Sequence, residues 1–130
     1  MNRRSFGRAG ECSAALYLES LGYEILGRNV YSSRDELDII AANSEYILFV
    51  EVKTRRQRPA ERTPYGRPAR AVTAEKQRHM IAAARLYIHE HPDTVADRQP
   101  RLDVIEVYVD PSSDAYRVLD IEHFPGAVHR

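Results

Sequence analysis

Two apolar stretches decide the fold of this 130-residue chain: Glu36-Leu37-Asp38-Ile39-Ile40 and Phe49-Val50-Glu51-Val52-Lys53-Thr54-Arg55. Both set charged side chains among large hydrophobic ones, and the polar residues Asn43-Ser44-Glu45 lie between them. This pattern predicts two strands, over 36–42 and 46–54, joined as a β-hairpin. Burying an unpaired charge is costly, so the two carboxylates and the lysine of the hairpin need partners.

The predicted hairpin brings those charged groups together. Side chains alternate between the faces of a strand, so Glu51 and Lys53 are expected on one face. If the hairpin closes with Asn43 opposite Tyr46, Asp38 falls opposite Glu51, where two like charges repel unless a cation lies between them. Two carboxylates with open coordination positions suit Mg²⁺, and Lys53 could orient water and neutralise charge on a phosphate. The alternative is an ordinary ion pair of Lys53 with one of the acids.

A helix predicted over residues 5–21 carries a carboxylate on its apolar side. Glu11 shares one helical face with Ala14, Ala15, Leu18 and Leu21, and Gly22 is expected to end the helix. We therefore expect Glu11 to face the interior and support the site. The alternative is that Glu11 only stabilises the N-terminal part of the helix through the helix dipole.

A second helix is predicted from Thr73, its N-cap, to His91, where Pro92 stops it. Gln77 begins an apolar stripe on this helix that continues through Ile81, Ala84 and Ile88. We expect Gln77 to point toward the site, and the alternative is an ordinary polar start to the helix. A polar connection over 93–100 follows.

Further strands are predicted over 23–30, 102–109 and 116–124. The element order is then α-β-β-β-α-β-β, which indicates an α/β fold with a mixed sheet flanked by helices. The length of the chain fits one domain over residues 1–130.

The segment 55–70 contains several prolines and a glycine and is predicted to be a long loop. From Lys53 onward it carries one acid, Glu61, against a series of cations: Arg55, Arg56, Arg58, Arg62, Arg67 and Arg70. The net charge of the chain is zero, with 19 basic and 19 acidic residues. A local cationic patch still attracts phosphate, so these arginines are predicted to bind nucleic acid. The alternative is a solvated loop.

Other classes of protein find little support in the sequence. No apolar run approaches the ~20 residues of a membrane-spanning helix, and the basic N-terminus is not followed by an apolar signal region. A single cysteine, Cys12, fits a reducing cytoplasm and is expected to be a small buried thiol. His89 and His91 diverge on a helix, and His79 is expected at the surface, so no zinc site is predicted. Neither a glycine-rich phosphate loop nor a nucleophilic triad is found.

Several motifs together resemble the small bacterial proteins of the UPF0102 family (the YraN-like proteins). The proteins of this family in turn resemble members of the PD-(D/E)xK nuclease superfamily and are similar to the archaeal Holliday-junction resolvases. Besides the two hairpin stretches, the resemblance is carried by Gly7-Arg8-Ala9-Gly10-Glu11, Leu21-Gly22-Tyr23, Arg28-Asn29, Ala71-Val72-Thr73 with Lys76-Gln77, and Arg101-Leu102-Asp103-Val104. It covers nearly the whole chain.

The resemblance implies a restriction-endonuclease-like fold and a metal-dependent nuclease site. Asp38 and Glu51 would be the ligands of Mg²⁺ or Mn²⁺, and Lys53 would be the catalytic lysine. Glu11 would be the additional helix-borne acid of the resolvase branch, and Gln77 the polar helix residue that accompanies such sites. A homodimer is expected by analogy with resolvases. The family usually has glycine before its Glu-x-Asp, whereas this chain has Asp35.

Three functions follow as hypotheses. The leading one is a Mg²⁺-dependent phosphodiesterase that acts on DNA, with structured or branched DNA favoured over RNA. The second is a nucleic-acid-binding module that keeps the fold and has little or no catalysis. The third is a structural protein in which the acids only form ion pairs.

Overall fold

The two signature stretches form neighbouring strands near the middle of a five-stranded sheet. The computed structural model describes residues 3–32, 34–61 and 72–129. The strands are β1 (Glu24–Ser32), β2 (Asp35–Ala42), β3 (Tyr46–Arg56), β4 (Gln99–Val109) and β5 (Val118–Val128). They lie side by side in sequence order, with β3 and β4 parallel and the other pairs antiparallel. The predicted α/β mixed sheet is confirmed.

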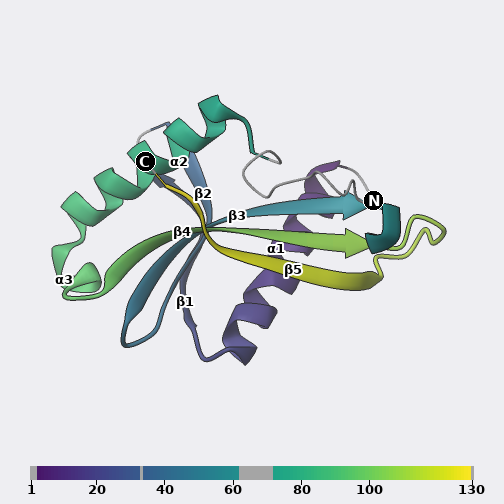
Figure 1. Ribbon diagram of the computed structural model, residues 1–130, viewed down its shortest axis with the longest axis horizontal. Coiled ribbons are helices and arrows are strands. Elements are labelled where there is room, and N and C mark those ends of the chain that lie inside the picture. The colour runs from purple at the N-terminus through teal and green to yellow at the C-terminus, as the bar shows by residue number, and fades with distance from the viewer. Residues whose placement is uncertain (1–2, 33, 62–71, 130) are drawn as a thin grey trace.

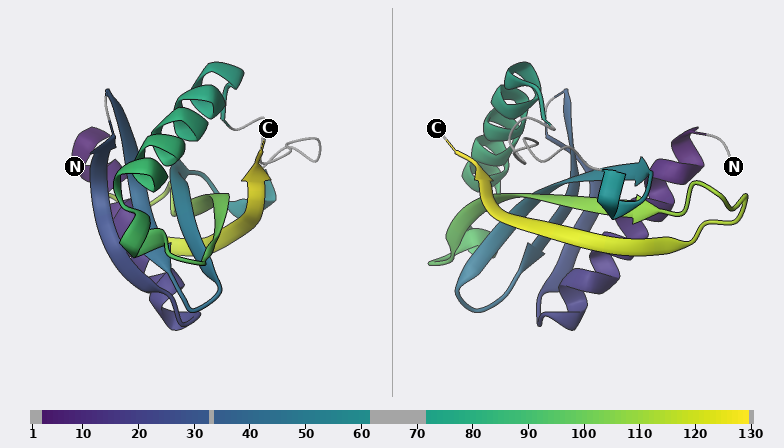
Figure 2. Two further views of the ribbon diagram at one scale, coloured as in Figure 1. Left: turned by 90° about the vertical axis from the view of Figure 1, so that its left-hand side faces the viewer. Right: turned by 45° about the vertical axis from the view of Figure 1, so that its right-hand side comes forward.

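Helices cover both faces of the sheet (Figures 1 and 2). Helix α1 (Arg3–Ser20) precedes β1, and α2 (Ala74–Glu90) forms the crossover that joins the parallel strands β3 and β4. A 3-10 turn, η1 (Pro59–Glu61), and a short helix, α3 (Pro92–Val95), complete the described elements. The element order is the predicted one apart from these two short additions.

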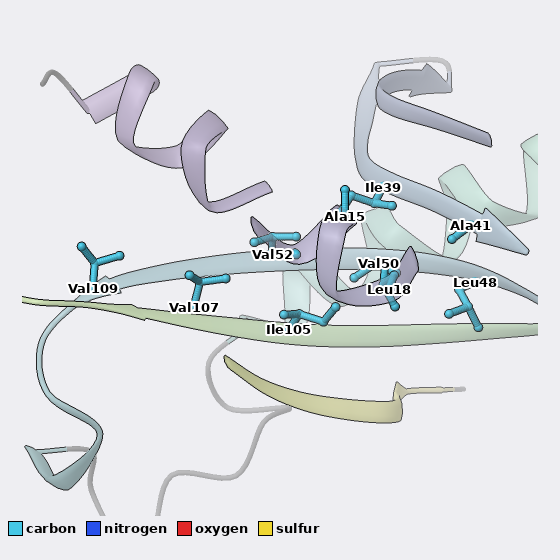
Figure 3. Close-up of a cluster of buried hydrophobic side chains, with 11 residues drawn as sticks. Ala15, Leu18, Ile39, Ala41, Leu48, Val50, Val52, Ile105, Val107 and Val109 are labelled. Carbon is cyan, nitrogen blue, oxygen red and sulfur yellow. The ribbon is translucent and has the colours of Figure 1, made fainter. Parts of the chain in front are cut away.

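The face of the sheet under α1 holds the larger apolar cluster. Ala15 and Leu18 of α1 pack over Val50 of β3 and Ile105 of β4 (Figure 3). Ala14 and Leu18 are fully buried, and Glu11 is only 7% exposed. The predicted inner stripe of this helix is therefore confirmed up to Leu18.

The opposite face packs against α2, through a stripe that differs from the predicted one. The buried residues of α2 are Met80, Ala83, Ala84 and Tyr87. Ile81 and Ile88 are only partly buried at the edges of the clusters. The ring of Tyr87 meets Phe49 edge-on at 5.6 Å. The inner face of α2 thus passes through Tyr87 instead of the predicted Ile88.

The ends of both long helices follow the sequence signals. Thr73 caps α2, because its side chain accepts a hydrogen bond from the Lys76 backbone N–H. Gly22, the second residue after α1, adopts φ 95°, a conformation that favours glycine. Leu21 therefore lies in the turn after the helix, and its predicted burial is wrong: it is 52% exposed.

Two further expectations need correction. Cys12 is exposed, because the buried face of α1 passes through Gly10, Glu11 and Ala14 and leaves position 12 outside it. The predicted connection over 93–100 contains α3, where Pro92 stands at the first position of the helix, a place that proline favours. His79 lies at the surface as expected.

The ends of two strands also differ from the predicted ones. β4 begins at Gln99, whose backbone N–H donates to the Glu45 carbonyl at 2.8 Å. β3 extends through Arg56, inside the segment predicted as a loop, and the remainder of that segment beyond residue 61 lies outside the described residues. None of the described helices has both the length and the apolar character that a membrane span requires.

Candidate functional site

The predicted site forms where β2 and β3 separate. These strands pair from Ala42 and Ile47 as far as Ile39 and Val50, which is the register expected from the sequence. One position further, where Asp38 would face Glu51, the ladder ends while β3 stays paired with β4. Strands that part in this way open a gap between two backbones, and the two acidic side chains stand at its edge.

The side chain of Asp38 fills the place of a backbone acceptor in this gap. Its Oδ2 atom accepts a hydrogen bond from the Val52 N–H at 2.9 Å. Regular alternation is interrupted here, because Leu37 packs on the α2 side of the sheet and Ile39 on the α1 side. The break in alternation turns Asp38 toward α1 instead of leaving it on the α2 face.

Asp38 is an acid in a strongly unfavourable place for a charge. Burial, and after it the neighbouring charge of Glu51, raises the pKa of Asp38 to about 8, although the hydrogen bond from the Val52 N–H opposes the shift. The charge of Glu11 makes a smaller contribution to the same shift. A group in this setting stays protonated near neutral pH unless a cation is supplied.

Helix α1 delivers Glu11 to the site through a close approach at Gly10. A methyl group at Gly10 would lie 1.8 Å from the Thr54 Oγ1 atom of β3, so only glycine lets the helix and strand come this near. Glu11 follows directly and is buried. Burial raises the pKa of Glu11, and the charge of Glu36 raises it further.

Glu11, Glu36 and Asp38 form a cluster in which one oxygen of each lies within 4.8 Å of the others. With its amide turned so that the nitrogen faces these acids, Asn29 donates to Glu11 Oε2 at 2.8 Å and to Glu36 Oε1 at 2.5 Å. Such a set of hard carboxylate oxygens fits Mg²⁺ or Mn²⁺. Glu51, the second predicted ligand, is not part of this cluster, although it lies beside Asp38 and lines the same cleft.

Two lysines approach Glu51 from different elements. Lys53 Nζ lies 3.5 Å from Glu51 Oε1, and Lys76 Nζ of α2 lies 3.7 Å from Glu51 Oε2. The Glu51 side chain is 7% exposed, whereas each lysine is about one-third exposed. The Lys53–Glu51 contact is the ion pair named above as the alternative, so the catalytic role of Lys53 stays a prediction. Lys76 is a second cation at Glu51, a residue that the sequence analysis quoted only as part of a motif.

Gln77 lies at the start of α2 beside Lys76. Its side-chain Nε2 donates to the Val72 carbonyl at 2.9 Å, which fastens the residue before the helix cap. The role of Gln77 in a site stays a prediction.

The arginines that were predicted to bind nucleic acid are engaged with the protein where they are described. Arg55 Nε lies 3.4 Å from Glu106 Oε2, and an Arg58 nitrogen lies 3.9 Å from Asp110 Oδ1. The Arg56 guanidinium lies over the ring of Phe6 in α1, 4.6 Å from the ring centre. Their predicted role in binding is untested, and the remaining members fall outside the described residues: Arg62, Arg67 and Arg70.

A cleft of about 420 Å³ opens onto the acid cluster. Besides the acids, it is lined by Asn29 and Tyr31 of β1 and by three arginines from the first turns of α1: Arg3, Arg4 and Arg8. Sequence reasoning missed these residues and Glu36. The spacing of Glu36 two before Asp38 could have indicated it, whereas the α1 arginines depend on how that helix sits on the sheet.

The family model described as "Uncharacterised protein family UPF0102" matches residues 10–107. A UPF0102 protein of Syntrophotalea carbinolica is 44% identical over 126 residues, covering 96% of this chain and 92% of the relative. A UPF0102 protein of Caldicellulosiruptor saccharolyticus is 40% identical over 121 residues, covering 93% and 94%. The chain belongs to the UPF0102 family.

Asp35, which stands where the family usually has glycine, contacts helix α2 in this UPF0102 chain. Asp35 Oδ1 lies 3.2 Å from His79 Nδ1, which joins the start of β2 to α2. The Ser32 hydroxyl donates to the Ala83 carbonyl at 2.9 Å and ties the end of β1 to the same helix. The end of β1 and the start of β2, next to Glu36, are therefore both attached to α2.

A second buried network in this family member lies away from the cleft. Asp103 is fully buried and accepts hydrogen bonds from Arg101 Nε at 2.9 Å, from the Gly126 N–H at 2.9 Å and from His123 Nε2 at 2.8 Å. The Tyr17 hydroxyl lies 3.2 Å from His123 Nδ1. The Asp103 motif of the sequence thus joins β4, β5 and α1.

Proposed function

We propose that this protein is a Mg²⁺-dependent endonuclease that hydrolyses phosphodiester bonds in DNA, with branched or structured DNA as its substrate class. The observation that carries the proposal is the placement of Asp38 against Glu51 where β2 and β3 part, with Glu11 above it and Lys53 beside it. Hydrolysis adds water across a P–O bond and leaves a phosphate monoester and a hydroxyl. These residues are of the types that this reaction requires.

The alternative in which the acids only form ion pairs fits the surroundings of Asp38 less well. The charges that contribute most to the pKa of Asp38 are those of the acids Glu51 and Glu11, and both raise it. An ion pair would lower that pKa. A like-charged cluster gains stability from a bound cation, so its presence supports a metal site.

Each residue has a separate part in the proposed reaction. Asp38 and Glu51 would hold the metal, which supplies positive charge that activates water and stabilises the phosphate. Glu11 and Glu36 would complete the oxygen ligands or order the water shell. The Lys53 ammonium would orient the attacking water and neutralise charge that develops on the phosphate oxygens.

The test compares the wild type with Glu51→Ala and Lys53→Met on end-labelled single-stranded, duplex, flapped and four-way-junction DNA. Each reaction is run with Mg²⁺, Mn²⁺ or EDTA. Glu19→Gln is the matched control, because Glu19 is an exposed acid on α1 outside the cleft. We expect metal-dependent cutting by the wild type and the control, and a loss of at least 100-fold in both site variants. Light scattering on the same proteins measures whether they form the homodimer that is expected by analogy with resolvases.

Failure to cut any substrate would overturn the nuclease proposal. If salt-sensitive DNA binding persisted in that case and survived Glu51→Ala, the protein would be the nucleic-acid-binding module of the second hypothesis. Cutting that persisted in Glu51→Ala would instead show that the activity arises elsewhere.

A further inference from the structure

An exposed aromatic side chain stands beside the acid cluster. Tyr31 of the edge strand β1 is 70% exposed and lines the same cleft as Glu36 and Asp38. In the β1–β2 ladder Tyr31 pairs directly with Glu36, and residues opposed in this way carry their side chains on one face. The exposed ring therefore offers an aromatic face, on which a planar group can stack, directly beside the acid cluster.

The rim of the cleft near Tyr31 is cationic. Arg3, Arg4 and Arg8 come from the first turns of α1, are exposed and line the cleft. Arginine is suited to phosphate through its planar fork of donors. The cleft therefore offers three chemistries side by side: acids that fit a metal, cations that fit phosphates and an aromatic face that fits a base.

We propose that Tyr31 and these arginines form a subsite for an unpaired nucleotide next to the phosphate that is cut. The inference rests on the proposed function for the identity of that phosphate. The base of the nucleotide stacks on the Tyr31 ring, and the arginines bind the adjoining phosphates. The subsite makes single-stranded, flapped or frayed DNA the preferred substrate over continuous duplex.

The requirement for an unpaired base follows from the geometry of stacking. In a continuous duplex both faces of each base are covered by neighbouring base pairs, so a protein ring reaches a base face only after the base is unstacked. Because every base has an aromatic face, stacking tolerates any sequence. The cleft volume of about 420 Å³ falls within the range of about 300–1,000 Å³ typical of small-ligand sites, which suits one nucleotide.

The first experiment measures binding with Ca²⁺ in place of Mg²⁺, with the DNA checked to be intact. The wild type, Tyr31→Ala, Tyr31→Phe and the control Leu16→Ala are titrated with single-stranded and blunt duplex DNA of one sequence. Leu16 is also exposed, at 64%, and lies on α1 outside the cleft. We expect Tyr31→Ala to weaken single-strand binding about tenfold and duplex binding less than twofold. Tyr31→Phe and the control should bind like the wild type.

A second readout reports stacking directly. The oligonucleotide carries 2-aminopurine flanked by abasic positions, so its emission is quenched when an aromatic ring stacks on it. We expect quenching with the wild type and Tyr31→Phe and its loss with Tyr31→Ala. Equal weakening of single-strand and duplex binding in Tyr31→Ala, or quenching that survives this variant, would overturn the inference.

The outcomes separate this inference from the proposed function. If Glu51→Ala abolishes cutting while Tyr31→Ala changes neither substrate preference nor quenching, the nuclease proposal stands and the subsite is rejected. If no substrate is cut but the quenching depends on Tyr31, the nuclease proposal is rejected and the unpaired-base subsite stands as a binding site.

Discussion

The Val52 N–H donates to Asp38 Oδ2 at 2.9 Å, so a side-chain carboxylate takes over the role of a strand backbone at the point where β2 leaves β3. The bond keeps Asp38 beside Glu51 although burial and like charge raise its pKa. A site of this kind has a cost in stability in the absence of a cation, and that cost can be measured.

Asp38→Asn is expected to stabilise the metal-free protein. The asparagine side chain still offers an oxygen to the Val52 N–H. Asparagine does not ionise, so near pH 7 folding no longer has to protonate a carboxyl that is charged in the unfolded chain. We expect unfolding in EDTA to require roughly 1–3 kcal/mol more than in the wild type. Thermal melts should show that Mg²⁺ raises the Tm of the wild type but not of the variant.

The control for that variant is Asp97→Asn, which removes an exposed acid after α3. It should leave both the Tm and its response to Mg²⁺ unchanged. A lower Tm in Asp38→Asn would instead favour the hypothesis in which Asp38 is an ion-pair partner.

The pH dependence of the metal-free protein should carry the signature of Asp38. Its pKa is raised from 3.8 to about 8 on folding, so between these values the native state binds more protons than the unfolded state. Stability contributed by the protonated form is complete below about pH 4 and is lost as the pH rises toward 8. Urea titrations in EDTA should show this decline, and Asp38→Asn should flatten it.

Much of the hairpin could be predicted from the sequence because local rules fix it. The short polar connection sets the register of Asp38 and Glu51, and alternation of apolar residues sets their strands. Thr73 caps its helix as expected because a cap depends on nearby backbone groups alone. The burial of Glu11 followed from helical spacing in the same way.

The rest of the site depends on contacts between distant segments. Asn29, with φ 52°, reaches Glu36 only because β1 pairs with β2 in one register. The turn of Asp38 toward α1 requires a break in alternation that apolar spacing does not reveal. The arginine rim depends on how α1 packs on β3, where Gly10 allows a close approach to Thr54.

Asp103→Asn tests the network that joins β4, β5 and α1. Burial raises the pKa of Asp103, but hydrogen bonds from His123 and Arg101 lower it more, so the net shift is downward. The variant leaves Arg101 without its buried partner, and we expect a loss of about 3–5 kcal/mol. Equilibrium unfolding in urea measures it, with Asp97→Asn as the control.

Asp103 should make the free energy of unfolding fall as the pH is lowered, whereas Asp38 makes it fall as the pH is raised. Because the folded-state pKa of Asp103 lies below the ordinary value of 3.8, its contribution is complete above that value and is lost as the pH falls through the folded-state pKa. Melts below pH 4 should show a steep decline in the wild type. A variant as acid-sensitive as the wild type would rule out Asp103 as the source.

Gly10→Ala tests whether the seat of α1 positions Glu11. The added methyl would meet Thr54 Oγ1 at 1.8 Å, and we expect a loss of about 1–3 kcal/mol in unfolding free energy. Gly7→Ala is the matched control, because a methyl there meets nothing within 4 Å and alanine favours the helix. Combining Gly10→Ala with Thr54→Ala should recover part of the loss in urea unfolding. A Gly10→Ala protein as stable as Gly7→Ala would show that the helix can shift, and that this contact does not fix Glu11 over the acids.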